Sequence, residues 1–139
     1  GCGLIWLPPV LPFTGDAVRQ ALSLAEPIFG QHGFDFFATL STVTERALSA
    51  VMTIAYDKSS QAETDAARAC YRDLLQAMVR GGYPPYRLNP AAMAANMLAE
   101  DPYWQTVDDL KRVLDPHRIV APGRYSRFEG PGTQLSPTD

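Results

Sequence analysis

Alternating and helical spacings of apolar residues divide the first part of the chain into a strand and a helix. Leu4 to Leu7 is an apolar run that ends at Pro8-Pro9, so it predicts a strand that stops there. From the cap residue Thr14 onward, apolar residues recur at helical spacing. Pro27 lies inside this stretch and is expected to kink or end the helix.

Two strands and three helices are expected after it. The strands cover residues 34–43 and 47–56, and the short polar turn between them makes the pair antiparallel. Alternate positions give the second strand one apolar face, made of Leu48, Ala50, Met52, Ile54 and Tyr56. Ser60 and Glu63 have the spacing of a capping box, which predicts a helix that Gly81-Gly82 ends.

Two short helices complete the expected series. Asn89-Pro90 and Asp101-Pro102 each place a cap residue before a proline, which is typical of a helix start. The second short helix is expected to turn four apolar residues inward: Trp104, Val107, Leu110 and Val113. The complete order predicts an α+β fold, in which an antiparallel sheet carries helices packed on one face.

The domain boundaries follow from composition. We expect one domain over residues 1–125 and a loose tail over 126–139, where Gly, Pro, Ser and Thr dominate. The chain has 139 residues and begins on an apolar strand without an initiator Met. Natural domains usually begin with loose polar residues. We therefore expect the chain to be a fragment of a longer protein, truncated on its N-terminal side.

Charge and hydropathy exclude several classes of protein. The net charge is -3 and no basic run occurs, so the electrostatic footprint of a nucleic-acid binder is missing. No segment approaches the roughly 20 apolar residues that a membrane span requires. No signal peptide is visible, so a cytoplasmic and a periplasmic location both stay open. Cys2 and Cys70 are too few for a disulfide scaffold, and each is expected to be a buried small apolar residue.

Most motifs that carry chemistry are missing. The sequence has no glycine-rich phosphate loop, no metal-ligand spacing and no nucleophile elbow. His32 and His117 lie far apart in sequence and are interpreted as surface or capping residues. The pair Asp108-Asp109 is expected on a solvated helix face. We therefore expect no metal site.

Residues 83–87 (Tyr-Pro-Pro-Tyr-Arg) form the most informative segment. Two prolines hold it extended and leave it little conformational entropy to lose. The hydroxyl of Tyr86 and the guanidinium of Arg87 would form a strong anion site if both reached one point. Neighbouring side chains of an extended chain point in opposite directions, so this requires the backbone to turn there. The alternative is a packed loop in which Arg87 bonds a carboxylate or a carbonyl.

Three blocks of sequence carry a resemblance to a known family. Residues 1–10 (GCGLIWLPPV), 82–87 (GYPPYR) and 114–124 (LDPHRIVAPGR) resemble, in this order, segments of the vanillyl-alcohol oxidase and 4-cresol methylhydroxylase family. These proteins are FAD-linked oxidoreductases of para-substituted phenols. The resemblance spans nearly the whole chain and implies the C-terminal, substrate-side part of such a flavoprotein, with an FAD-linked oxidase C-terminal domain fold.

The resemblance implies roles for individual residues. Tyr86 and Arg87 would hold the phenolate oxygen of the substrate, which makes them the expected catalytic pair. Ile5 and Trp6 would line the cavity near the flavin ring, and Arg124 would place a positive charge near the flavin or the phenol. The implied reaction is hydride transfer to flavin from a 4-alkylphenol or a 4-hydroxybenzyl alcohol.

The resemblance also implies a cofactor and partners. FAD would be held mainly by an N-terminal domain outside this chain, so the isolated chain is expected to be inactive. The expected partners are that domain, a small phenolic substrate, and either a cytochrome or oxygen as electron acceptor; homo-oligomerisation stays open. Some members attach FAD through a histidine near the position of Gly3. Gly3 has no side chain for such a bond, so a covalent link is not supported.

Two alternatives stay open at this point. The chain could come from another FAD-linked oxidase or dehydrogenase of the hydroxy-acid type. A carboxylate substrate needs no tyrosine partner for a phenolate, so Tyr86 beside Arg87 argues against this alternative. The second alternative is a non-catalytic isolated domain that serves as a binding module.

Overall fold

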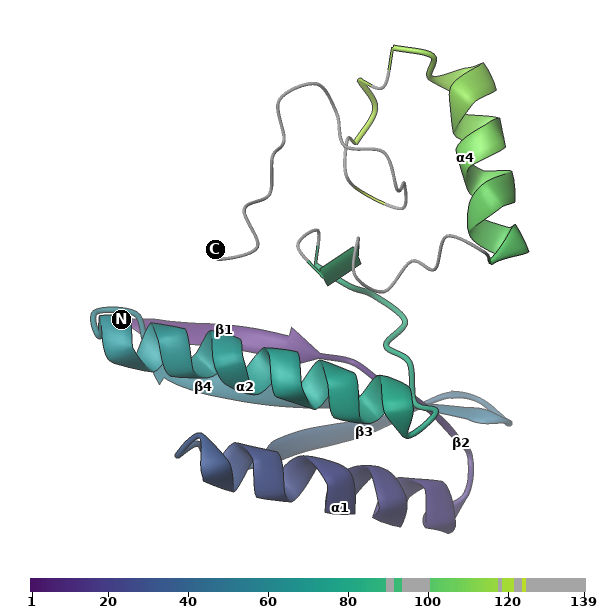
Figure 1. Cartoon of the computed structure of the whole chain (residues 1–139). Coiled ribbons are helices and arrows are strands. Elements are labelled where there is room, and N and C mark those ends of the chain that lie inside the picture. Colours follow the sequence, from purple (N-terminus) through teal and green to yellow (C-terminus); the bar gives the residue numbers. More distant parts are fainter. Residues whose placement is uncertain (90–91, 94–100, 118, 122–123, 125–139) are drawn as a thin grey trace. The chain divides into compact units, whose positions relative to one another are not determined.

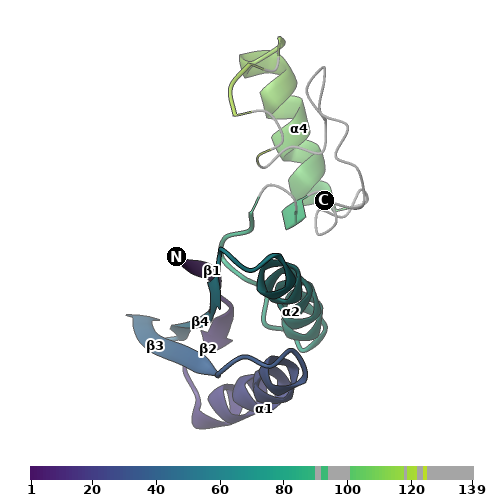
Figure 2. The ribbon, with the colours of Figure 1, turned by 90° about the vertical axis from the view of Figure 1, so that its left-hand side faces the viewer.

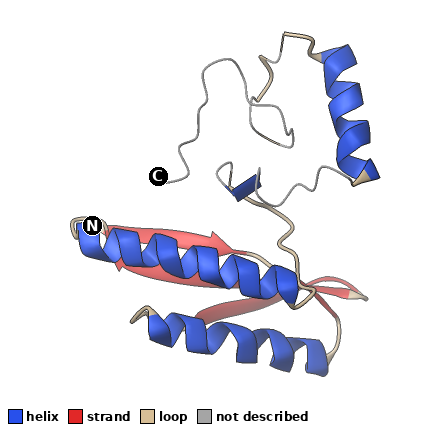
Figure 3. Ribbon diagram, in the orientation of Figure 1, coloured by secondary structure: helices blue, strands red, loops and turns tan. Residues whose placement is uncertain are grey.

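The computed structural model describes residues 1–89, 92–93, 101–117, 119–121 and 124. The chain divides into two compact units, Gly1–Arg87 and Leu88–Asp139. The first unit contains a four-stranded antiparallel sheet and two long helices, which Figures 1 and 3 show. This confirms the expected α+β class. The expected tail over 126–139 lies outside the described residues.

Strand β4 (Ala47–Asp57) is the centre of the sheet. β3 (Phe37–Thr44) pairs antiparallel with one edge of β4. β1 (Cys2–Leu7) and β2 (Val10–Pro12) also pair antiparallel with β4, at its opposite ends. Both must lie on the edge that β3 leaves free, because β3 occupies the other edge over the residues that they share. The two short strands therefore lie end to end along the same edge of β4.

Pro8 and Pro9 separate the two short strands without moving the chain away from β4. Neither proline has an N–H to give to a ladder. The Pro9 carbonyl nevertheless accepts from the Ala50 amide at 3.0 Å. The sequence correctly predicted that Pro8 ends β1, but β2 was not foreseen, because three residues after two prolines give no readable alternation.

The helices α1 (Gly15–Gln31) and α2 (Gln61–Arg80) lie on the same side of the sheet, as Figure 2 shows. The residues of β4 that were predicted to share an apolar face point toward them, and Met52 and Ile54 are completely buried. The core between helices and sheet consists of apolar side chains from both layers: Leu7, Leu11, Ala21, Ala25, Phe29, Ala50, Met52, Ile54, Ala67, Cys70, Leu74 and Met78. The prediction of helices on one face is confirmed.

Helix α1 begins at its expected cap and continues through Pro27. The Thr14 hydroxyl accepts from the Ala17 amide at 3.3 Å. Pro27 was expected to kink or end the helix, and the second of these alternatives is wrong, since the helix extends to Gln31. Pro27 is exposed, and the burial of Phe29 one half-turn later stabilises the last turn against the lost backbone bond.

Helix α2 begins at the predicted capping residues, with one difference. The Ser60 hydroxyl accepts from the Glu63 amide at 3.2 Å, as a capping box requires. The Glu63 carboxylate, however, accepts from the Asp57 amide at 2.8 Å rather than from the Ser60 amide. The Ser60 amide donates instead to the Asp57 carbonyl at 3.1 Å. Glu63 thus joins the end of β4 to the start of α2.

In the second unit, α4 (Pro102–Leu114) begins at the predicted cap Asp101, whose carboxylate accepts from the Tyr103 amide at 2.9 Å. Its predicted inward face is only partly correct. Trp104 and Val107 are half-buried, but Leu110 is 56% exposed and Val113 is 79% exposed. Asp108, expected on a solvated face, is buried.

Candidate functional site

The segment that carries Tyr86 and Arg87 leaves α2 through a tightly defined helix end. The Tyr83 amide donates to the Met78 carbonyl at 2.8 Å, and the Gly82 amide donates to the Val79 carbonyl at 3.1 Å. This is the hydrogen-bond pattern of a Schellman cap, and Gly82 has the left-handed φ of +82° that it requires. The direction in which the chain leaves the helix is therefore fixed.

The segment then pairs with the junction between β1 and β2. The Val10 amide donates to the Pro84 carbonyl at 3.0 Å, and the Tyr86 amide donates to the Pro8 carbonyl at 3.2 Å. Pro9 and Pro85 face each other in an isolated antiparallel bridge between these bonds. The fold thus brings together the first and second sequence blocks, which lie more than seventy residues apart.

The side chains of Tyr86 and Arg87 are exposed to solvent. Tyr86 is 62% exposed, Arg87 is exposed, and the backbone bends at Tyr86. Within the described part of the chain, neither side chain has a hydrogen-bond or ion-pair partner. The carboxylate or carbonyl that the packed-loop alternative requires for Arg87 is therefore not found among the described residues. The bend is the feature that two neighbouring side chains need in order to reach one ligand.

The face of the sheet opposite the helices carries exposed apolar side chains. Trp6 and Phe37 are both directly opposite Thr53, one on each side of β4, so the three residues form a row across the sheet. Leu4, two residues before Trp6, lies on the same face. Leu4, Trp6 and Phe37 are each more than half exposed. Within Gly1–Arg87, these three apolar side chains are therefore not covered by another element.

Ile5 lies on the other face of β1 from Trp6. It is opposite Ile54, whose side chain is buried under the helices, and Ile5 is itself half-buried. A ligand on the uncovered face would contact Trp6 directly, whereas the side chain of Ile5 lies on the opposite, helix-covered face of β1.

The residue opposite Gly3 in the sheet leaves no room for a side chain at position 3. It is opposite Tyr56, and a Cβ atom added to Gly3 would lie 2.4 Å from the Cζ atom of the Tyr56 ring. Such a distance is far below van der Waals contact, so the ring occupies the space that a side chain at position 3 would need. Gly3 also lies on the helix-covered face, because Ile5 and Leu7 alternate with it.

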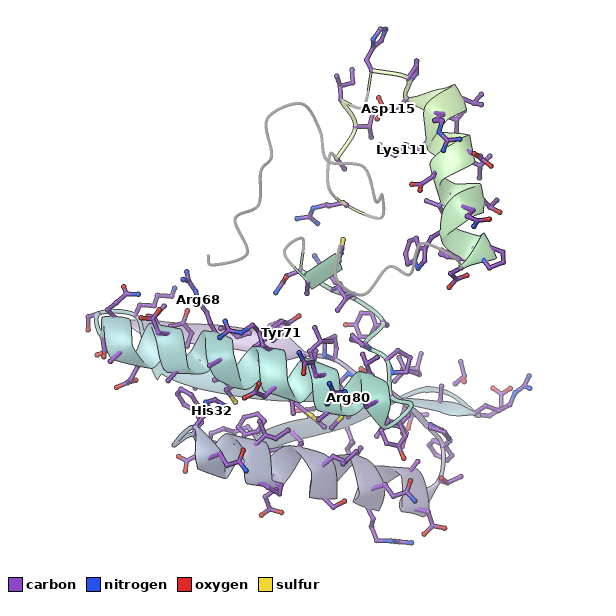
Figure 4. The ribbon with its side chains drawn as sticks, in the orientation of Figure 1. His32, Arg68, Tyr71, Arg80, Lys111 and Asp115 are labelled. Atoms are coloured by element: carbon purple, nitrogen blue, oxygen red, sulfur yellow. The ribbon has the colours of Figure 1, made fainter. Side chains whose placement is uncertain are left out.

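The third block forms a hydrogen-bonded turn after α4 in the second unit. The Asp115 carboxylate accepts from the Ile119 and Val120 amides at 2.9 and 3.0 Å and from Lys111 Nζ at 2.7 Å. Lys111 also donates to the Val120 carbonyl at 2.7 Å. Figure 4 shows Lys111 and Asp115 together at this end of α4. The hydrogen bond from Lys111, with those from the Val120 and Ile119 amides, lowers the pKa of Asp115.

This network gives Asp115 a structural role and leaves the apolar part of the block exposed. Ile119 and Val120 are both exposed. Arg124 is exposed, and its amide donates to the Ala121 carbonyl at 3.1 Å in a turn. Lys111 was not among the predicted residues, although its spacing of four residues from the cap Asp115 was a readable signal.

The remaining candidates for chemistry do not form a second site. His32 Nε2 lies 2.8 Å from Asp73 Oδ2, so His32 joins the end of α1 to α2 (Figure 4). Cys70 is buried as expected, and burial together with the charge of Asp73 raises its pKa to about 11. The prediction for Cys2 is wrong, since this residue is exposed at the start of β1. His117 is exposed, as expected.

The described residues contain neither a metal cluster nor a membrane-spanning helix. They contain no group of three or more His, Cys, Asp or Glu side chains placed to hold a metal ion. Among them, none of the helices combines the length and hydropathy needed to span a bilayer.

Comparison with known proteins gives matches over nearly the entire chain, although no protein-family model matches it. The chain is 39% identical over 131 residues to 1'-carboxy-chondrochloren decarboxylase from Chondromyces crocatus, which covers 94% of this chain and 24% of that protein. It is 30% identical over 125 residues to the flavoprotein subunit of 4-cresol dehydrogenase [hydroxylating] from Pseudomonas putida, which covers 89% of this chain and 24% of that protein.

A solved structure supports the same relationship at the level of the fold. The chain matches 4-ethylphenol oxidase from Gulosibacter chungangensis, in its isoeugenol complex, with a TM-score of 0.82 and 21% identity. The match covers 92% of this chain and 25% of that protein. The chain is therefore similar by sequence to the first two proteins and by fold to the third, along a stretch that spans about a quarter of the length of each.

Proposed function

We propose that the chain is the substrate-side part of an FAD-dependent oxidoreductase that oxidises para-substituted phenols, and that Tyr86 and Arg87 hold the phenolate oxygen. The observation that carries this proposal is the geometry of the Tyr86–Arg87 segment. Its backbone is fixed against Pro8 and Val10, while a phenol hydroxyl and a guanidinium remain exposed without partners in the described part of the chain. The names of two matched proteins, a cresol dehydrogenase and an ethylphenol oxidase, agree with a phenolic substrate.

The task of these two residues is to ionise the substrate. A free phenol has a pKa of about 10, so at neutral pH only about one molecule in a thousand is ionised. A nearby cation and a donated hydrogen bond both favour the anion. Lowering the pKa by roughly two to three units corresponds to about 3–4 kcal/mol, which a charge-assisted site shielded from water can supply. The phenolate then donates electron density to the para position and weakens the benzylic carbon–hydrogen bond.

In the proposed enzyme, this chain would contact the flavin ring of FAD but would not hold the cofactor tightly. When bound, it would accept the hydride from the benzylic carbon. The exposed apolar side chains of Leu4, Trp6 and Phe37 would suit one side of a planar aromatic ring. Arg124 would add a positive charge near the ring or the phenol. The chain offers no glycine-rich loop for the pyrophosphate, so another part of the protein would hold it.

The proposal includes no covalent flavin link at position 3. The ring of Tyr56 fills the space beside Gly3, on the face that the helices cover. Because it also has no glycine-rich loop for the pyrophosphate, the purified 139-residue chain should bind FAD weakly and show no turnover. Gel filtration after mixing with FAD measures this: stoichiometric flavin absorbance in the protein peak would contradict it.

Two electron acceptors are open to the proposed enzyme. The cresol relative is named as a flavoprotein subunit, which favours an acceptor on a partner chain, such as a cytochrome. Oxygen is the other acceptor that suits a reduced flavin. The complete protein, reduced by a phenol and then mixed with air or with a cytochrome, distinguishes the two.

A second candidate is the removal of a side-chain carboxylate from a phenolic substrate. It is favoured by the 39% identity to 1'-carboxy-chondrochloren decarboxylase. The same pair of residues would serve this reaction if hydride loss from the benzylic carbon came first, because the resulting quinone methide accepts the electron pair that departing CO2 leaves behind. The two candidates differ in the product, since decarboxylation releases CO2.

The test compares two substrates in the complete protein that carries this chain. In the first experiment, the complete protein is mixed anaerobically with a 4-alkylphenol, unlabelled or deuterated at the benzylic carbon, and flavin absorbance is followed. A phenol with a ¹³C-labelled side-chain carboxylate is monitored for labelled CO2. Phenol oxidation predicts flavin bleaching that deuterium slows. Labelled CO2 without reaction of the alkylphenol would instead establish the second candidate.

Variants connect the reaction to the proposed pair. Arg87→Ala should slow flavin reduction by roughly two to three powers of ten. Tyr86→Phe should cost less, because a neutral hydrogen-bond donor is worth less than a charge. Arg68→Ala is the matched control: Arg68 is an exposed arginine of the same unit, on α2 and outside the segment. Wild-type rates in Arg87→Ala would disprove the assignment.

A further inference from the structure

Tyr83 links the start of the Tyr83–Arg87 segment to a helix that is distant in sequence. The residue is only 6% exposed, and its hydroxyl donates to Gln20 Oε1 at 2.7 Å. Gln20 lies on α1, whereas Tyr83 directly follows the cap of α2. This bond spans 63 residues of sequence, so it fixes the segment to the helix layer and does not merely close a local turn.

The segment is held on both sides of its two prolines. On one side, Tyr83 is fixed by the α2 cap and by Gln20. On the other side, the Tyr86 amide donates to the Pro8 carbonyl. Pro84 and Pro85 lie between these fixed points and have restricted φ angles, so little backbone freedom remains. The position of Tyr86 therefore depends on where Tyr83 is held.

Burial of the ring alone does not explain why position 83 carries a tyrosine with its hydroxyl group. A phenylalanine would fill the same space without needing a hydrogen-bond partner. Gln20 is exposed, so its side chain loses rotamer freedom in order to accept this bond. A bond of this kind adds direction to packing, because it fixes how far the ring can move along its own axis.

We infer that Tyr83 and Gln20 are positioning residues, which hold the segment so that Tyr86 and Arg87 reach one phenolate oxygen. This inference rests on the proposed function of Tyr86 and Arg87. Neither Tyr83 nor Gln20 is assigned a contact with the substrate. They act through the backbone between Tyr83 and Arg87.

The first test uses the 139-residue chain alone and needs no substrate. In Tyr83→Phe, hydrogen exchange of the Val10 and Tyr86 amides should accelerate by roughly five- to tenfold, which is the effect of losing one hydrogen bond that restrains a local opening. The amides between β1 and β4 should exchange as in the wild type. Equal acceleration throughout the sheet would indicate a general structural role and overturn the inference.

Conservative variants make this test specific. Gln20→Ala should reproduce the effect of Tyr83→Phe, whereas Gln20→Glu should exchange as slowly as the wild type, because a carboxylate still accepts the bond. Tyr56→Phe is the matched control, since the Tyr56 hydroxyl has no hydrogen-bond partner among the described residues. Faster exchange in Gln20→Glu than in Gln20→Ala, or no acceleration in Tyr83→Phe, would refute the inference.

The second test separates positioning from the proposed function. In the complete protein, Tyr83→Phe should slow flavin reduction by roughly tenfold, as expected from a small misplacement of binding groups. It should also raise the pKa of a bound phenol, and Gln20→Glu should preserve the wild-type values. If Arg87→Ala were without effect, the proposed function would fail. If Arg87→Ala were impaired but Tyr83→Phe matched the wild type, only the positioning role would fail.

Discussion

Replacing Gly3 by alanine should destabilise the sheet, against the usual trend for glycine in a strand. Alanine normally gains about 0.5–1 kcal/mol over glycine inside such an element. Here the new Cβ would lie 2.4 Å from the Tyr56 ring, whereas carbon atoms in contact are about 3.5–4.0 Å apart. The half-buried ring must therefore move by more than about 1 Å, which forces it outward.

The expected cost follows from the area that the ring loses. A buried aromatic side chain covers about 150–250 Å². If Tyr56 exposes roughly 80 Å² of this, about 25 cal/mol per Å² gives a loss of about 2 kcal/mol. After the ordinary gain from alanine, about 1–1.5 kcal/mol of destabilisation remains. For a domain of this size, Tm should fall by about 3–8 °C.

Urea unfolding, followed by circular dichroism, measures this effect in a double-mutant cycle. In the Tyr56→Ala background, Gly3→Ala should become neutral or slightly stabilising, with a coupling of about 1–2 kcal/mol between the two sites. Gly30→Ala is the matched control, because a Cβ at Gly30 of α1 meets no atom within 4 Å, and it should stabilise the chain. A stabilising Gly3→Ala without coupling to Tyr56 would refute the account of why position 3 has no side chain.

Two further predictions concern titratable groups outside the segment. When the native chain is treated with iodoacetamide near pH 8, the exposed Cys2 should be alkylated. Cys70 should stay unmodified until denaturant is added, because burial raises its pKa to about 11. Mass spectrometry measures the labelling, and equal labelling of both cysteines would contradict the prediction. Asp115 has a lowered pKa, so its stabilisation of the turn is present above the ordinary value of about 3.9 and disappears as the pH falls through the folded value. The protection of the Ile119 amide against hydrogen exchange, relative to an unstructured amide at the same pH, should therefore fall in acid. Asp115→Asn should lower this protection several-fold at neutral pH as well, whereas pH-independent protection would contradict the role of the carboxylate.

The sheet and its helix layer could be predicted from the sequence because the signals were local. Strict alternation in β4 identified its buried face, and Thr14, Ser60 and Asp101 each marked a helix start by their cap chemistry. The continuation of α1 past Pro27 was not predictable in the same way, because the burial of Phe29, which offsets the penalty of one proline, depends on the tertiary fold.

The parts that could not be predicted depend on contacts between distant residues. The bond between Tyr83 and Gln20 leaves no trace in any local pattern, and neither does the pairing of Pro84 with Val10. Leu110 was assigned inward from helical spacing, which identifies an apolar stripe but not what covers it.

The candidate site was predicted from motifs and not from periodicity. The pairing of Tyr86 with Arg87 came from residue chemistry and the family resemblance, and the bend that the pair requires could be seen only in the structure. The separation of Ile5 from Trp6 was available from strand alternation, which puts neighbours on opposite faces.

The central claim is that Arg87 and Tyr86 ionise a bound phenol, and the pKa of that phenol tests it most directly. The measurement is an absorbance titration of a para-substituted phenol without an oxidisable carbon, bound to the complete protein, in the wild type and in Arg87→Ala. The account predicts a bound pKa roughly two to three units below that of the free phenol in the wild type. It predicts a return toward the free value in Arg87→Ala. An unshifted pKa in the wild type, or the same lowered pKa in both proteins, would contradict it.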